Sequence, residues 1–103
     1  TTGKTLIDLS AEFGVPAGIK AVMVLISARD SGSSTGQALV ALSPNNVSLS
    51  YPGALKLSNI TNDRRMPMEV IIKCNSDGDI YYQLVATGTN TLDVWLEIWG
   101  YYQ

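Results

Sequence analysis

Acid–base chemistry in this chain would depend on its nine Asp and Glu residues, because the sequence of 103 residues contains no histidine. The absence of histidine excludes Ser-His-Asp and Cys-His nucleophile systems and histidine-ligated zinc. A glycosidase holds its two carboxyl groups roughly 5 to 9.5 Å apart. Asp93 and Glu97 lie four positions apart on one expected strand, which separates them by about 13 Å at ~3.3 Å per residue. We therefore expect no catalytic residues and no enzymatic activity.

A second pair of carboxylates, Asp77 and Asp79, flanks Gly78 in a short polar segment. The pair lacks the further acidic positions and the downstream glutamate of a twelve-residue calcium loop. It also has no apolar surroundings that would shift a carboxyl pKa. We interpret both residues as turn formers, and we expect neither a bound metal nor a cofactor.

The aromatic residues near the end of the chain indicate a binding surface. Over residues 91–99, alternation places both Trp95 and Trp99 on the polar side of an expected strand, away from its leucines. Strands that bury aromatics in their own core place them in register with the aliphatic residues. The indoles are therefore expected to face another subunit or a ligand. The alternative is that a loop of the same chain covers them, as in a central strand that is buried on both sides.

Tyrosines extend this expected aromatic surface. Tyr82 is in phase with Ile80 and Leu84 and is predicted to face the core, whereas Tyr81 is predicted to point outward. Aromatic residues with a polar group are favoured both in subunit interfaces and in sugar-stacking sites. We favour an interface, because polar side chains on the same faces would supply hydrogen bonds among the rings. Its predicted members are Tyr81, Trp95, Trp99 and Tyr101, with Tyr102 beside them.

The elements that position these residues are predicted to be short strands separated by turns. Residues 19–28 are apolar on both faces and are predicted to form a central strand. Asn75 to Gly78 is predicted to be a hairpin turn that joins two paired strands, because Asp-Gly suits the positive backbone angles of such turns. Gly14, Pro16 and Gly18 limit any early helix to one turn. Further strands are expected over residues 5–9, 37–42, 47–50, 54–60, 68–75, 80–86 and from residue 91 to the end. The pattern predicts one all-β domain over residues 1–103, an antiparallel β-sandwich of about eight short strands with jelly-roll or Greek-key connections and no helix.

Composition limits the partners. Seven basic and nine acidic residues give no broad positive field, and only Arg64 and Arg65 form a basic pair, so nucleic acid is not expected to bind. No apolar run approaches the ~20 residues of a spanning helix, so no membrane insertion is expected. The single Cys74 is in phase with Val70 and Ile72 and is predicted to be a small core residue. Since the chain begins with Thr1, we interpret it as a piece or a processed product of a longer protein.

The order of several motifs resembles the C-terminal β-sandwich modules of bacteriophage tail fibres and related phage surface proteins. These motifs are IDLS at residues 7–10, VPAGIKAV at 15–22, ARDS at 28–31, DGDIYY at 77–82 and WLEIWGY at 95–101. The resemblance implies a module at the tip of a longer fibre, on the virion surface, that forms a homotrimer and contacts a host-cell surface polysaccharide. It implies no catalytic motif.

Recognition is usually carried by loops on a rigid scaffold, so the two long polar loops, residues 30–36 and 61–67, are the expected receptor-facing elements. Their candidate ligand-binding residues are Asp30, Ser33, Asp63, Arg64 and Arg65. The alternative for the two arginines is a solvated loop with a salt bridge to Asp63. Two further functions stay open: a purely structural trimerisation cap, and a monomeric carbohydrate-binding module that uses Trp95 or Trp99 as its platform.

Overall fold

The computed structural model describes residues 3–30, 38–47, 53–56, 65–86 and 92–103. This part of the chain forms seven strands and one short helix, in the order β1 (Thr5–Ile7), α1 (Leu9–Phe13), β2 (Ala21–Asp30), β3 (Ala38–Ser43), β4 (Gly53–Lys56), β5 (Arg65–Lys73), β6 (Ile80–Ala86) and β7 (Leu92–Tyr102). The predicted strand over residues 80–86 is confirmed. Val47, predicted to begin another strand, is not in one, and residues 48–50 lie outside the described residues.

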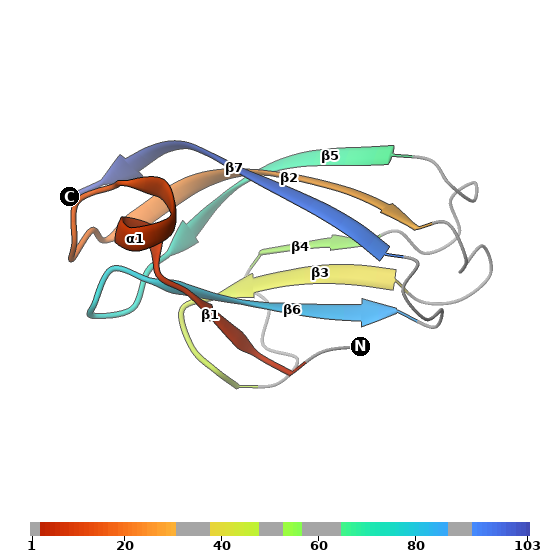
Figure 1. Ribbon diagram of the computed structural model, residues 1–103, viewed down its shortest axis with the longest axis horizontal. Helices are drawn as coiled ribbons and strands as arrows, with labels where there is room; N and C mark the ends of the chain where they lie inside the picture. The colour runs from red at the N-terminus through yellow and green to blue at the C-terminus, as the bar shows by residue number, and fades with distance from the viewer. Residues whose placement is uncertain (1–2, 31–37, 48–52, 57–64, 87–91) are drawn as a thin grey trace.

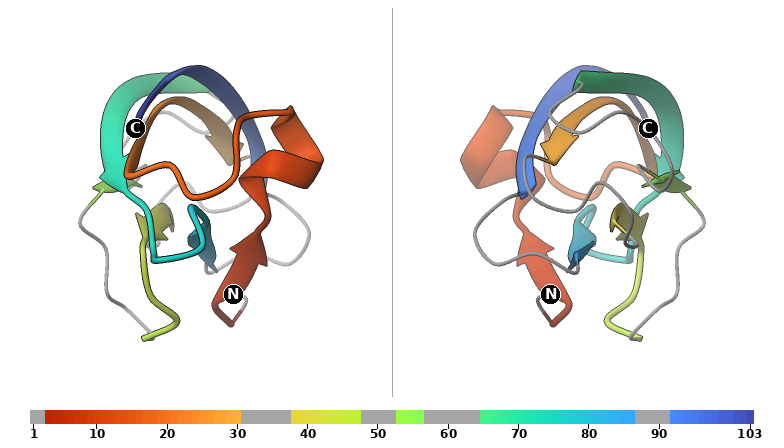
Figure 2. Two further views of the ribbon diagram at one scale, coloured as in Figure 1. Left: turned by 90° about the vertical axis from the view of Figure 1, so that its left-hand side faces the viewer. Right: turned by 90° about the vertical axis from the view of Figure 1, so that its right-hand side faces the viewer.

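The strands form two antiparallel sheets that pack face to face (Figures 1 and 2). Sheet A has four strands in the order β1, β6, β3, β4, and sheet B has three in the order β5, β2, β7. The all-β sandwich predicted from the sequence is therefore confirmed. β2 is the central strand of sheet B, as its apolar character on both faces predicted.

The core lies between the two sheets. Val22, Val24 and Ile26 of β2 point into it and are fully buried, while the alternating residues of the same strand point outward. Cys74 belongs to the same core, which confirms its predicted role. Burial, and to a smaller extent the negative charge of Asp79, raises the pKa of the Cys74 thiol.

Helix α1 was not predicted, and local capping explains why it forms. The Asp8 side chain accepts hydrogen bonds from the Ala11 N–H at 3.2 Å and from the Ser10 hydroxyl at 2.9 Å. These bonds, the backbone one foremost, lower the pKa of the Asp8 carboxyl. Gly14 ends the helix in the left-handed conformation, with φ at 71°, and Leu9 anchors the helix in the core. The helix follows β1 and lies at one side of the sandwich, toward one end (Figures 1 and 2).

The Asn75–Gly78 turn does not make the predicted hairpin, because β5 and β6 belong to different sheets. The turn crosses from sheet B to sheet A. Its Gly78 has φ at 82°, as Asp-Gly predicted, but it packs against the backbone of Gly18, whose N–H donates to the Asp77 carbonyl at 3.2 Å. The side chain of Asn75 accepts from the N–H groups of Asp77 and Asp79, which stabilises this corner.

Candidate functional site

The outer face of sheet B carries both tryptophans. Leu92, Val94, Leu96 and Ile98 of β7 pack against the core, so Trp95 and Trp99 point away from it, as predicted. Trp95 is 41% exposed and Trp99 is 63% exposed. Both indoles remain exposed in the isolated chain, so the alternative that a loop of the same chain covers them is wrong.

Arg65 also lies on this face, although it was predicted to belong to a loop. β5 begins at Arg65 and includes residues 65–67 of the predicted loop. Pro67 is tolerated there because β5 is at the edge of sheet B among the described strands. The predicted ligand-binding residue Arg65 and the predicted interface residue Trp95 thus share one surface.

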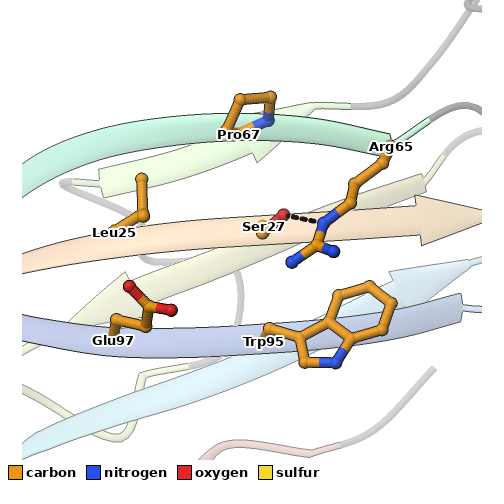
Figure 3. Close-up of a pocket in the computed structure, with 6 residues that line it drawn as sticks. All are labelled: Leu25, Ser27, Arg65, Pro67, Trp95 and Glu97. Carbon is orange, nitrogen blue, oxygen red and sulfur yellow. Dashed lines mark hydrogen bonds between the residues drawn. The ribbon is translucent and has the colours of Figure 1, made fainter.

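The guanidinium of Arg65 is held in place by two neighbours (Figure 3). Its Nε donates a hydrogen bond to the Ser27 hydroxyl at 2.6 Å, and its central carbon lies 4.4 Å from the centroid of the Trp95 ring. Ser27 is only 6% exposed and stands between Pro67 of β5 and Trp95 of β7 in the strand register. The arrangement combines a hydrogen bond with a cation–π contact, which fixes the charged group over β2.

These residues line a shallow hollow of about 360 Å³, which we call the Trp95 hollow. Leu25 and Ser27 form its floor, with Arg65 and Pro67 on the β5 side and Trp95 and Glu97 on the β7 side (Figure 3). The Glu97 carboxylate accepts a hydrogen bond from the Trp99 indole at 3.1 Å. A floor of one apolar and one hydroxyl side chain, with a guanidinium and a carboxylate at its sides, is suited to a small polar ligand.

A cross-strand row of charges borders the Trp95 hollow. Arg29 of β2 lies opposite Arg65 on one side and Asp93 on the other. Arg29 forms an ion pair with Asp93 at 2.8 Å. Arg65, Arg29 and Asp93 thus form a row of charged side chains across the three strands of the sheet.

A β-bulge divides the outer face of β7. The register with β2 shifts between Met23 and Val24, so that Trp99 is the extra residue and Gly100 lies opposite Met23. Beyond the bulge, Tyr102 shares the outer face with Ala21, and Tyr101 lies opposite the core residue Val22. The bulge thus places Tyr102, in place of Tyr101, on the outer face with the tryptophans. Tyr101 is nonetheless 43% exposed, and its membership of an interface stays a prediction.

Trp99 belongs to a second, more apolar patch, the Trp99 patch, formed by Met23, Ile71, Trp99 and Tyr102. The strand register brings these residues together beyond Leu25. Ile71 is 55% exposed, and Tyr102 is also exposed. Exposed apolar side chains that lie together are typical of surfaces that bind another protein.

Tyr81 lies far from this surface. It alternates with Ile80 and Tyr82, which contact the core, and it pairs with Leu6 and Ser43 in sheet A. It therefore points to the outer face of the other sheet, and the predicted single surface with Trp95 and Trp99 is wrong. The prediction that Tyr82 faces the core is confirmed.

Most of the predicted loop residues fall outside what the structure describes. Ser33, Asp63 and Arg64 are outside the described residues, and Asp30 is seen only as the last backbone position of β2. Ser27, Leu25 and Pro67 were not predicted as site residues. Alternation along β2 puts Leu25 and Ser27 on one side of the strand, but the sequence does not show which strands flank β2.

No known protein identifies this surface. Neither a family model, nor a curated protein, nor a solved structure matches the chain. In the described segments, no three acidic or cysteine side chains gather as a metal site would require. The described helix is too short to cross a membrane. The chemistry of the outer face of sheet B is thus the basis for a functional proposal.

Proposed function

We propose that this chain is a non-catalytic tip module of a phage tail fibre, which assembles as a homotrimer and binds a host-cell surface glycan. The observation that carries the proposal is the exposure of both indoles on the outer face of sheet B. The number of copies and the virion location come from the resemblance to fibre modules. In this proposal the chain is the outer end of a longer fibre protein.

Assembly is assigned to the Trp99 patch. Trp99 and Ile71 are more exposed than Trp95, and no cation covers the Trp99 ring among the described residues. Removing such side chains from water on association contributes about 25 cal/mol per Å² of apolar surface. Tyr102 adds a phenol hydroxyl that an interface between copies can use.

Recognition is assigned to the opposite end of the same face, where charged groups surround Trp95. Such a site binds hydroxyl-rich ligands by stacking and hydrogen bonds, and three copies of a weak site gain from multivalency. Asp93 and Glu97 are engaged with Arg29 and Trp99 respectively. These contacts favour binding over acid–base catalysis.

The finer fold class is part of the proposal. Among the described strands, only β3 and β4 are consecutive and neighbour each other in one sheet, while each other consecutive pair belongs to different sheets. This connectivity favours a Greek-key or jelly-roll description over a meander of hairpins.

Light scattering coupled to size exclusion tests the assembly. The native particle is expected to have three times the 11.1 kDa mass of the chain, and Trp99→Ser is expected to reduce it to the monomer. Leu6→Ser is the matched control, because Leu6 is an exposed aliphatic residue on β1 of sheet A. A monomeric wild-type protein, or a trimer that Trp99→Ser leaves intact, would overturn the assembly.

Adsorption to host cells tests recognition and separates it from a structural cap. A variant with Arg64 and Arg65 both changed to Ala is expected to adsorb less while it still assembles. Unchanged adsorption with intact assembly would favour the purely structural module. Glycan binding by a stable monomer would instead favour an independent carbohydrate-binding module.

A further inference from the structure

We propose that the Trp95 hollow binds an acidic sugar residue, with the sugar carboxylate on Arg65, its ring on Trp95 and its hydroxyls on Glu97. This inference rests on the proposed glycan-binding function and adds the site and the class of ligand.

The first argument is that two neighbours already hold the Arg65 side chain in a fixed position. Its Nε is used by Ser27, and its position is further fixed by the Trp95 ring. The Nη1 and Nη2 groups form the remaining edge of the guanidinium, and that edge donates two parallel hydrogen bonds to a carboxylate. Because the side chain is already ordered, less conformational entropy is lost on binding.

The second argument is local charge. Among the described residues, Arg65 has only Ser27 and Trp95 as polar or aromatic partners, and neither carries a negative charge. The nearest cross-strand neighbour is another guanidinium, Arg29, which is paired with Asp93. The described contacts of Arg65 therefore include no carboxylate, although Glu97 lines the other side of the same hollow, and a ligand carboxylate would supply a direct counter-charge to Arg65.

The third argument is the rest of the Trp95 hollow. Its volume of about 360 Å³ is at the lower end of the range for small-ligand sites, which suits one sugar ring. Trp95 and Leu25 offer apolar surface to the C–H groups of a pyranose. Glu97, on the side of the hollow away from Pro67, is an acceptor for hydroxyl groups (Figure 3). A carboxylate, hydroxyls and an apolar ring face occur together in a uronic acid.

The test compares methyl β-glucuronide with methyl β-glucoside, which differ only in the carboxylate. Each is titrated into the assembled protein while the indole N–H signal of Trp95 is followed by NMR, with Trp99→Phe to assign the signal. The glucuronide is expected to shift the Trp95 signal saturably and to bind at least about tenfold more tightly, as a charge-assisted bidentate contact implies. Equal affinity for the two sugars would overturn the inference.

Substitutions test whether the preference for the glucuronide depends on Arg65. Arg65→Gln is expected to abolish the preference for the glucuronide, and Lys73→Gln is the control, because Lys73 is an exposed cation on the same strand outside the hollow. An unchanged preference in Arg65→Gln would contradict the site. Tighter binding of N-acetylglutamate, as a mimic of an acidic peptide, would contradict the sugar and indicate a peptide partner.

A second readout separates this inference from the proposed function. Binding of a panel of purified bacterial surface polysaccharides, some with uronic acids and some neutral, is measured for the wild type and for Trp95→Ala. Polysaccharide that binds both proteins equally would refute the hollow but keep the glycan-binding module. A panel in which no polysaccharide binds either protein would refute the proposed function itself.

Discussion

The guanidinium of Arg65 lies 4.4 Å from the ring of Trp95, although β6 and two crossings between the sheets separate the two residues in the sequence. The contact exists because β5 and β7 flank β2, and because Pro67 and Trp95 are both opposite Ser27. A cation and an aromatic ring from the two outer strands thereby meet over the central one. The sequence predicted Arg65 to lie in a recognition loop and Trp95 on an assembly strand. The contact shows that both side chains belong to one surface.

Replacing Arg65 by Ala is expected to destabilise the fold modestly. The variant loses a cation–π contact of about 0.5–1 kcal/mol and leaves the buried Ser27 hydroxyl without its partner. We expect the free energy of unfolding in urea to fall by about 1–2 kcal/mol. Lys73→Ala is the matched control and is expected to change it by less than about 0.5 kcal/mol. Equal effects of the two substitutions would show that the contacts of Arg65 with Trp95 and Ser27 contribute nothing.

Gly78 tests the corner that connects the two sheets. A Cβ at this position would lie 2.6 Å from the backbone N of Gly18, and the backbone is already at φ 82°. Gly78→Ala is therefore expected to cost more than about 2 kcal/mol in unfolding free energy. Gly14→Ala is the control, because Gly14 has a similar φ of 71° but no atom within 4 Å of the added Cβ. It is expected to cost about 1 kcal/mol. If both variants lose the same stability, the close approach at Gly18 has no energetic role.

Cys74 should make the stability of the fold depend on alkaline pH. Burial raises the pKa of its thiol in the folded state, so the unfolded chain releases this proton first as the pH rises. A free thiol titrates at a pH of about 8.5. Below that pH the thiol makes its full contribution to the free energy of unfolding, and above it the contribution declines. The stability difference between wild type and Cys74→Ala is therefore expected to shrink between pH 8 and pH 10 in urea titrations. A difference that stays constant over this range would contradict the raised pKa.

Sequence periodicity predicted correctly which way side chains point where a strand alternates regularly. It placed Tyr82 and Cys74 in the core and both tryptophans on the outer face, because side chains alternate strictly along an uninterrupted strand. It did not predict that Tyr102, in place of Tyr101, lies on the outer face, because the bulge at Trp99 and Gly100 depends on the pairing with Met23. Alternation within one strand carries no information about such a shift.

Features that depend on distant parts of the chain were also missed. The Asp-Gly signal predicted the positive φ of Gly78, but whether the next strand pairs locally is decided by packing against Gly18 and by the hydrogen bond from the Cys74 N–H to the Lys20 carbonyl. The Trp95 hollow was missed for the same reason, since its residues come from three strands whose order the sequence did not reveal. Helix α1 had a readable signal in the capping side chain of Asp8, which the prediction overlooked.

The most direct test of the assigned surface is the accessibility of Trp99 in the native particle. Acrylamide quenching is measured on Trp95→Phe, in which Trp99 is the only tryptophan and in which the isolated chain leaves its ring 63% exposed. We predict that Trp99 is protected at concentrations where the protein is assembled and becomes quenchable on dilution to the monomer. Quenching as strong as that of free N-acetyltryptophanamide at every concentration would contradict the account, because the outer face of sheet B would then have no partner copy.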